Sequence, residues 1–415
     1  DGMMVVKNHG EVVATVPAAK LADEAPLYHR DSKEPEYLQK TRNLKLDDIP
    51  ALADPQQSLI NLLRWPSIAS KNWVYRQYDH MVRAGTAVSP GSDAAVIRVK
   101  ADSYPPLPVG EPKDEIPDKY LAMSVDCNGA QVYLDPYEGS KATVAEAARN
   151  LVCSGARPLG STDNLNFGNP HNPELFWQLK ESVRGLAEAC EAFNTPVTGG
   201  DVSLYNQNPA GAIDPTPTVG MVGIIDNPEN ITSQWFKDEG DAVILLGEPV
   251  NTEDPLFGLG GSALLQVEHG KKEGTPPPCD LEQEKLLQDT LLGLIETGVV
   301  KSAHDCSEGG LAVAVAESAV SELTARQSPR LTGADLDLSD IECFRIDVLL
   351  FGENHGRVVI TTSEAESGAA VERAKLLGVP AQRIGTVTAG DALNIKCSES
   401  TFVWKLSELH GAWWN

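Results

Sequence analysis

The chain has 415 residues, 41% of them hydrophobic and 22% charged, which predicts a globular protein of two or three domains. Its formal net charge of −25 would repel a phosphate backbone, so no nucleic-acid partner is expected. Seven cysteines without a CxxC spacing argue for reduced thiols in a cytoplasmic protein. No apolar run reaches the roughly 18 residues of a membrane span, so no membrane partner is expected either.

Residues 1–30 read as two strands around the turn Asn8-His9-Gly10. Because a lone hairpin cannot bury a core, we expect it to end a domain whose other strands lie upstream in a longer polypeptide. Residues 31–59 mix Asp, Glu, Lys and Pro and are interpreted as a linker.

Residues 60–226 carry a first pattern of alternating helices and strands. Apolar spacing and turn residues predict a helical stretch at 57–80, strands at 94–99 and 120–125, helices at 140–156 and 173–193, and strands at 196–198 and 219–225.

A polar stretch at 226–240 predicts a domain boundary, and a second unit follows at 238–392. Its expected elements are strands at 242–246, 347–351 and 357–361 and helices at 282–297, 311–322 and 364–376. Residues 393–415 are taken as a C-terminal tail. The mixture predicts an α+β or α/β fold for both units.

The run Asp163-Asn164-Leu165-Asn166-Phe167-Gly168-Asn169-Pro170 is dense in turn-forming residues and is predicted to be a loop between a strand and a helix. Asp163 could hold a metal ion or a ribose hydroxyl. From the local sequence alone, an Asx-turn that leads into the next helix is the favoured interpretation.

The segment Thr198 to Asn206 places Gly199 and Gly200 after a strand, with Asp201 and Ser203 next. Glycine backbone N–H groups can hold a phosphate, and an adjacent aspartate can hold magnesium. The segment is neither a Walker A loop nor GxGxxG, and a tight turn would explain the glycines equally well.

Further carboxylates at Asp126, Asp135 and Glu138 could supply oxygen ligands to magnesium, although a solvated acidic surface explains them as well.

A third segment runs from Ser302 to Leu311 and precedes a helix, with Ser307 as a candidate N-cap. The helix start and its glycines could bind an anion. His304-Asp305 invites a catalytic dyad and Cys306 a nucleophile, but no partner for either is evident. A capped helix with a structural His304 is favoured.

Taken in chain order, six segments resemble the second half of the small, bacterial-type subunit of phosphoribosylformylglycinamidine synthase, the PurL family. They are SKNWVYRQYDHMV (70–82), PGSDAAVIRV (90–99), the run 135–170 with DNLNFGNP at its end, TPVTGGDVSLYN (195–206), PTPTVGMVGII (215–225) and HDCSEGGLAVAVAES (304–318). The resemblance extends over the whole chain.

The resemblance implies a fold shared with aminoimidazole ribonucleotide synthetase (PurM). In such a PurM-like unit, an N-terminal α+β domain contributes to a central β-barrel, and a C-terminal α/β domain packs outside it. The family has two units in tandem. The chain would then hold the end of the first unit (1–30), a linker (31–59), and the second unit's domains (60–226 and 238–392).

The resemblance also implies the reaction. ATP with Mg²⁺ activates the amide of formylglycinamide ribonucleotide as a phosphorylated imidate, and ammonia displaces the phosphate to give the amidine. The expected partners are the N-terminal half of the polypeptide, a glutaminase subunit (PurQ) that supplies ammonia from glutamine, and an accessory subunit (PurS).

Residue by residue, Asp163 and Gly200 match ATP-contacting positions of the family, Asp201 matches a magnesium position where some members carry Asn, and Ser203 matches a substrate-contacting position. No catalytic residue is identified, because the family's general-base His lies in a His-Asn-His-Pro-Ser motif of the first unit.

The counterparts of other first-unit site residues are altered in this chain. They are Asp126-Cys127-Asn128-Gly129-Ala130 for the general-base motif, Arg149-Asn150 for an Arg-Asp pair, and Glu353-Asn354-His355 for Glu-Ser-Gln. We therefore expect this half to lend ATP and metal contacts to a composite site.

Two alternatives remain. The chain could be another ATP-dependent enzyme of the same architecture, although those enzymes lack DNLNFGNP. It could also be a nucleotide-binding structural half without turnover.

Overall fold

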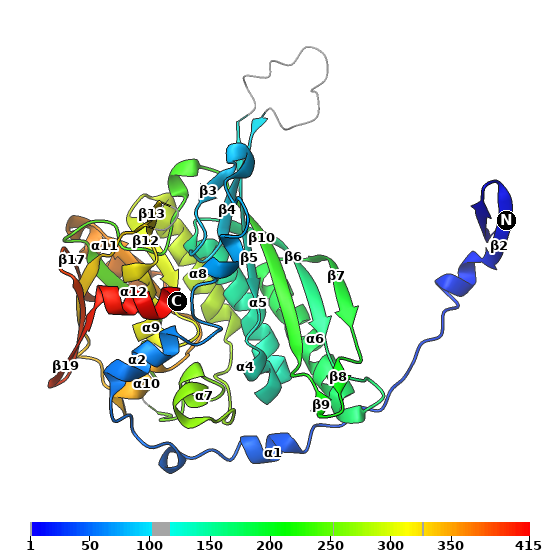
Figure 1. Cartoon of the computed structure of the whole chain (residues 1–415), viewed down its shortest axis with the longest axis horizontal. Helices are drawn as coiled ribbons and strands as arrows, with labels where there is room; N and C mark the ends of the chain where they lie inside the picture. The colour runs from blue at the N-terminus through cyan, green and yellow to red at the C-terminus, as the bar shows by residue number, and fades with distance from the viewer. Residues whose placement is uncertain (1, 102–116, 252, 326–327) are drawn as a thin grey trace.

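The structure is a computed structural model that describes residues 2–101, 117–251, 253–325 and 328–415. Two mixed α/β bodies pack side by side (Figure 1). An N-terminal hairpin projects away from both of them at the end of an extended segment that has no regular secondary structure. Among the described residues, no helix is both long enough and apolar enough to cross a membrane.

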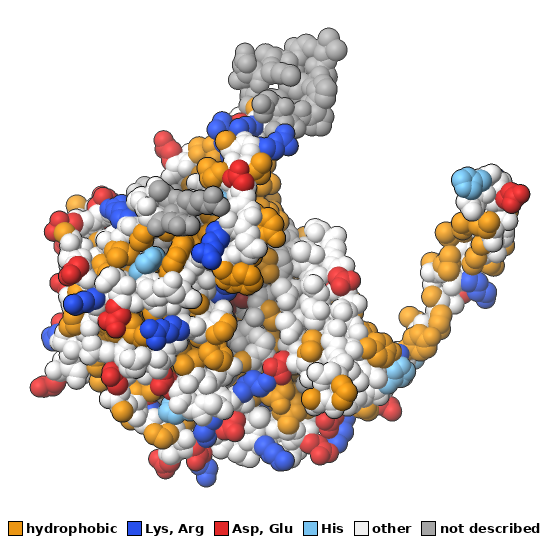
Figure 2. Space-filling view, viewed as in Figure 1, with side chains coloured by type: hydrophobic (Ala, Val, Ile, Leu, Met, Phe, Trp, Pro, Cys, Tyr) orange, Lys and Arg blue, Asp and Glu red, His pale blue; other side chains and the backbone are white. Residues whose placement is uncertain are grey.

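The predicted N-terminal hairpin is present. Strands β1 (Met3–Asn8) and β2 (Glu11–Pro17) pair antiparallel, and His9 and Gly10 form the turn with positive φ angles. A short 3-10 helix, η1 (Ala18–Leu21), follows. The apolar side chains of both strands face solvent (Figure 2).

The segment after the hairpin is tied to both bodies by short helices. These are α1 (Tyr37–Thr41), η2 (Leu46–Asp48), α2 (Pro55–Leu63) and α3 (Asn72–Tyr75). Tyr37 stacks on Tyr133 of the first body, whereas α2 buries its leucines in the second body. The continuous helical stretch predicted at 57–80 is therefore wrong, because α2 ends at Leu63 and α3 begins only at Asn72.

The first body contains a six-stranded sheet in the order β3-β4-β5-β10-β6-β7. The strands are β3 (Thr86–Val88), β4 (Ala95–Val99), β5 (Lys119–Asp126), β10 (Thr216–Ile225), β6 (Arg157–Asn166) and β7 (Val197–Ser203). Its helices are α4 (Gly129–Leu134), α5 (Pro136–Cys153) and α6 (Pro173–Phe193), and smaller elements are η3 (Val82–Ala84), β8 (Gln207–Asn208), β9 (Gly211–Ala212) and η6 (Pro228–Asn230).

Among the residues that the structure describes, helices cover only one face of this sheet. On β5, Ala122 and Ser124 are buried and Ser124 Oγ donates to Ala147 O of α5. Successive strand residues point to opposite faces, so Met123 and Val125 lie on the other face, where Val125 is 74% exposed. The first body therefore presents an open sheet face, which we call the open face.

The second body contains a seven-stranded sheet in the order β12-β16-β11-β17-β15-β18-β19. Its strands are β11 (Ala242–Leu246), β12 (Val300–Asp305), β15 (Gly333–Asp337), β16 (Val358–Thr362), β17 (Ala381–Thr388), β18 (Ala392–Cys397) and β19 (Ser400–Lys405), with a small hairpin of β13 (Leu323–Ala325) and β14 (Ser328–Pro329). Its helices are α7 (Ala263–His269), α8 (Leu281–Glu296), α9 (Gly310–Val320), α10 (Ile346–Phe351), α11 (Glu364–Leu376) and α12 (Leu406–Trp414).

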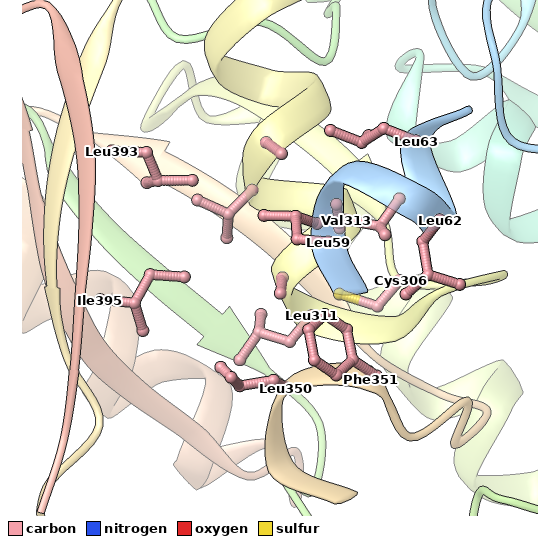
Figure 3. Packing of buried hydrophobic residues seen from close by; sticks show 14 of the residues in the cluster. Leu59, Leu62, Leu63, Cys306, Leu311, Val313, Leu350, Phe351, Leu393 and Ile395 are labelled. Atoms are coloured by element: carbon pink, nitrogen blue, oxygen red, sulfur yellow. The ribbon is translucent and has the colours of Figure 1, made fainter. Parts of the chain in front are cut away.

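Helices cover both faces of this sheet, so β11 is apolar along its whole length. Val243 and Leu245 belong to a core with α2, α9, α10 and α12, part of which is drawn in Figure 3. Ile244 and Leu246 face α8 and α11 in a second core. The sheet is thus the middle layer of a sandwich.

The strand predicted at 347–351 is wrong, because these residues form helix α10. A short apolar run does not distinguish a strand from a buried helix turn. Here Arg345 pairs with Asp347 at the start of the helix, and Val348 to Phe351 are all buried. Residues 393–415 supply β18, β19 and α12, so they share the sheet and core of the second body.

Candidate functional site

Both glycine- and asparagine-rich segments lie within strands. Residues 163–166 belong to β6, and 199–203 belong to β7, its parallel neighbour. The loop predicted at Asp163 is therefore wrong, and the tight turn left open as an explanation for Gly199-Gly200 does not form. Residues with poor strand propensity are held in the sheet because β10 and β7 pair with β6 on its two sides.

Asp163 and Gly200 are neighbours across this strand pair. They stand opposite each other in the register, and a Cβ on Gly200 would lie 2.1 Å from Asp163 Oδ1. Gly200 therefore has to be glycine for Asp163 to keep its position. Partial burial raises the pKa of the Asp163 carboxyl above its usual value.

Asp201 and Ser203 point to the other face of the same strands. Asp201 pairs in register with Asn164, and Ser203 pairs with Asn166. Strand alternation places these side chains on the open face, opposite to Asp163. The sheet thus brings all four residues to one strand pair but divides them between two faces.

The position of β7 makes this division compatible with one ligand. β7 is the last strand of its sheet, so a ligand at this edge can reach both faces and an unpaired side of the backbone. A Cβ on Gly199 would meet nothing within 4 Å, which leaves room for close approach. Glycine backbone of this kind suits phosphate groups.

A magnesium ion at this edge would rely on few protein ligands. Within the described parts of the chain, no group of three His, Cys, Asp or Glu side chains could hold a metal ion. Mg²⁺ commonly binds through one or two carboxylates, with phosphate oxygens and waters completing its shell. Asp201 therefore fits as a single carboxylate ligand to a nucleotide-bound ion.

The other carboxylates considered from the sequence are engaged elsewhere. Asp135 accepts N–H bonds from the first turn of α5, and Glu138 pairs with Lys141. Asp126 accepts a hydrogen bond from Asn150 Nδ2 at 3.1 Å. Burial, followed by the charge of Glu308, raises the pKa of Asp126 well above its usual value.

Arg149 lies at the junction of the two bodies and is 1% exposed on its side chain. Its Nη1 donates to Glu284 Oε1 at 2.6 Å, and its Nε and Nη2 form a fork with Asp305. The side chain is therefore fully committed to internal ion pairs.

Glu353 is also buried and hydrogen-bonded within the protein. Its Oε1 accepts hydrogen bonds from the backbone N–H groups of Ala263 (2.7 Å) and Gly309 (2.8 Å), at the starts of α7 and α9. Burial, followed by the charge of Glu308, raises the pKa of Glu353 to about 8. Burial also raises the pKa of the Glu308 carboxyl, to about 7.

The Glu353→Gln variant is expected to flatten the dependence of stability on pH. Because the pKa is raised in the folded state, the wild type loses stability as pH rises from about 4.5 to about 8. Glutamine keeps Oε1 as the acceptor and cannot ionise, so the variant should lose on the order of 3 kcal/mol less over this range. Urea unfolding at pH 5 and pH 8 gives the free energy of unfolding at each pH. An equal change between the two pH values for the variant and the wild type would contradict this prediction.

The segment His304 to Ser307 plays a structural part. His304 contacts Asp93 (2.9 Å) and Glu317 (3.2 Å), two charges that raise its pKa against the opposing effect of burial. Burial raises the pKa of Cys306 to about 11, so its thiol is not a nucleophile at neutral pH. The favoured structural interpretation of His304 holds, but the predicted cap is wrong, because Gly309 occupies the N-cap position and Ser307 does not.

Sequence reasoning missed the partners of these side chains. Asp93 lies 211 positions from His304, Glu284 lies 135 positions from Arg149, and Glu317 lies 13 positions from His304. No local pattern marks them, since each is one carboxylate among 59 acidic residues.

Two family models match the chain. The AIR synthase related protein, N-terminal domain, matches residues 91–225, and the AIR synthase related protein, C-terminal domain, matches residues 238–398.

Curated relatives match at least 93% of this chain. The phosphoribosylformylglycinamidine synthase subunit PurL of Moorella thermoacetica is 43% identical over 415 residues, which is 100% of this chain and 52% of the relative. The PurL of a Thermoanaerobacter species is 43% identical over 93% of this chain and 49% of its own length. The chain thus spans about half the length of these relatives.

Solved structures share the fold. Thermotoga maritima PurL complexed with FGAR superposes with a TM-score of 0.64 at 17% identity, over 85% of this chain and 53% of that one. The complex of the same protein with ATP gives a TM-score of 0.55 at 18% identity, over 70% of this chain and 44% of that one.

Proposed function

The chain belongs to the AIR synthase related family with PurL subunits of phosphoribosylformylglycinamidine synthase as its relatives, and from this we propose that it forms the C-terminal half of such a subunit. The reaction is the ATP-dependent conversion of formylglycinamide ribonucleotide to the amidine with ammonia from glutamine. The chain contributes nucleotide and magnesium contacts to a site completed by the N-terminal half.

The observation that carries this proposal is the fit between Asp163 and Gly200. Two motifs that are far apart in the sequence meet at one accessible sheet edge, and one residue lacks a side chain where the other needs room. In the proposed site, Asp163 and Gly200 contact ATP, Asp201 holds Mg²⁺ and Ser203 contacts the substrate. Magnesium would supply charge stabilisation for phosphoryl transfer.

The catalytic base would come from the other half. The counterparts of first-unit site residues are engaged internally here, with Arg149 and Glu353 as the clearest cases. A side chain that already has buried partners is not free to bind substrate. This arrangement supports the proposal that the first unit carries out the chemical step and that this chain binds nucleotide and magnesium.

Two features of the structure support the proposal that the chain is one half of a longer subunit. The open face exposes Met123, Val125 and Val222, as expected of a sheet that completes a barrel with a second domain. Hairpin β1–β2 and η1 repeat the order of β18, β19 and α12, in which strand, turn, strand and helix follow directly. We propose that the hairpin ends the first unit as β18–β19 ends this one.

A glutaminase subunit (PurQ) and an accessory subunit (PurS) are the further proposed partners. Support comes from the family relationship and from a solved Thermotoga maritima neighbour described as the structure of PurLQS, which shares this fold at a TM-score of 0.55.

The Asp201→Ala variant is expected to weaken magnesium-dependent ATP binding in the assembled enzyme by roughly tenfold, the effect of losing one charged ligand. The fold should be unchanged, because Asp201 is an exposed side chain with no ion pair among the described residues. Titration calorimetry with Mg·ATP measures this, and Glu191→Ala on the exposed surface of α6 serves as the control. Unchanged affinity for Asp201→Ala would contradict the assignment.

The second candidate function is a structural nucleotide-binding half that never turns over. The internally paired Arg149 and Glu353 favour it for the isolated chain. ATP binding without product, even after the N-terminal half is added, would distinguish it from the proposed enzyme.

A further inference from the structure

Helix α3 and the segment that leads from it to β3 expose their large apolar side chains to solvent. Trp73 is 62% exposed and Tyr78 is 69% exposed, and the segment also exposes Val74, Met81 and Val82. We call these five residues the aromatic patch. Single exposed apolar residues are ordinary, but five of them between residues 73 and 82, two of them aromatic, are typical of a surface that a partner covers.

Polar contacts fix this segment on the protein at both ends. Asn72 is buried, and its Nδ2 donates to the carbonyl oxygen of Trp414 at 2.5 Å. Ser70 N donates to the carbonyl oxygen of Trp413 at 2.8 Å, and Thr86 Oγ1 donates to the carbonyl oxygen of His80. The segment is therefore held by its polar groups, while the side chains of the aromatic patch stay exposed.

The charged rim of the aromatic patch is basic, although the chain as a whole is acidic. Lys71, Arg83 and Lys100 form no ion pair with a carboxylate of the described residues, and both lysines donate to backbone carbonyl oxygens instead. Asp79 is the one carboxylate between residues 71 and 83. A partner surface that carries carboxylates would complement this rim.

The place of the aromatic patch in the fold indicates which partner covers it. Helix η3 leads directly into β3, which is the outermost strand of the sheet that carries the open face. A domain that covers the open face therefore lies next to the aromatic patch. The chain spans 52% and 49% of two PurL relatives, so the other half of such a subunit has the length to supply this domain.

We propose that the aromatic patch is a docking surface for the N-terminal half of the subunit, on which Trp73 and Tyr78 contact an apolar area bordered by carboxylates. The inference rests on the proposed function, because it takes the partner from there. It adds a contact on the connecting segment, apart from the open face, and names the side chains that dominate it. A few large aromatic residues supply most of the binding energy at many interfaces.

Titration calorimetry of the chain with the N-terminal half of the Moorella thermoacetica PurL tests this inference. Trp73→Ala and Tyr78→Ala should each weaken the association about 30-fold, the loss typical of a central aromatic contact. Arg83→Gln should make the association less dependent on salt concentration, because it removes a rim charge. All three residues are exposed, so the fold of each variant should be unchanged.

Phe344→Ala is the matched control, because it removes an exposed aromatic ring of the second body that lies outside the aromatic patch. This variant should associate as tightly as the wild type. Association that Trp73→Ala and Tyr78→Ala leave unchanged would overturn this inference alone, whereas no association of the two halves would overturn the proposed function with it. A dimer of the chain alone in the analytical ultracentrifuge, abolished by Trp73→Ala, would assign the aromatic patch to a second copy and also overturn the inference.

Discussion

Replacing Gly200 with alanine is expected to lower the affinity of the assembled enzyme for Mg·ATP roughly 30-fold, the size of a lost charge-assisted contact. The new Cβ would come within 2.1 Å of Asp163 Oδ1 and 2.8 Å of Asp163 O. The side chain alone cannot relieve both contacts, so β6 must shift against β7. Titration calorimetry with Mg·ATP measures the loss.

Gly368→Ala on helix α11 of the second body provides the control for this experiment. Its Cβ would meet nothing within 4 Å, and its backbone is not in the left-handed region, so the fold should stay in place. The two variants add the same methyl group, one inside and one outside the proposed site. If Gly200→Ala bound Mg·ATP as tightly as the wild type, Asp163 and Gly200 would not form the nucleotide contact.

Replacing Arg149 with methionine is expected to destabilise the fold by roughly 3–5 kcal/mol, because it leaves buried carboxylates without their cation. Glu284 and Asp305 are each 2% exposed and share this one guanidinium. Arg149 extends from α5 in the first body to α8 and β12 in the second. Urea unfolding at neutral pH measures the loss.

Arg149→Lys separates charge from geometry. Lysine keeps a positive charge but cannot form the fork with Asp305 while reaching Glu284, so an intermediate loss is expected. A triple variant with Glu284→Gln and Asp305→Asn beside Arg149→Met removes the stranded charges and should recover part of the stability. Unfolding of Arg149→Met at the wild-type urea midpoint would contradict the account.

Long, strongly patterned elements could be predicted from the sequence. Helix α6 spans the predicted 173–193, and β11 spans the predicted 242–246, since a capped amphipathic run and a buried apolar run are distinctive. The strand predicted at 347–351 is helix α10 (Ile346–Phe351) instead, because six residues are too few to show a period.

The candidate site could be predicted only in part from the sequence. Its residues could be named from a resemblance, but their faces depend on the register of β6 with β7, in which a shift of one residue reverses every side chain. A tight turn was a possible explanation for the glycines, because their low strand propensity gives no sign that β7 pairs with β6. The ion pairs of Arg149 join residues more than 130 positions apart, which no local pattern encodes.

The measurement that tests the central claim most directly is ADP release from formylglycinamide ribonucleotide, Mg·ATP and ammonium. It compares this chain alone with the chain mixed with the N-terminal half of a PurL subunit. A composite site predicts activity only in the mixture and its loss with Gly200→Ala. Activity of the chain alone would contradict this account, because a general base would then lie within these 415 residues.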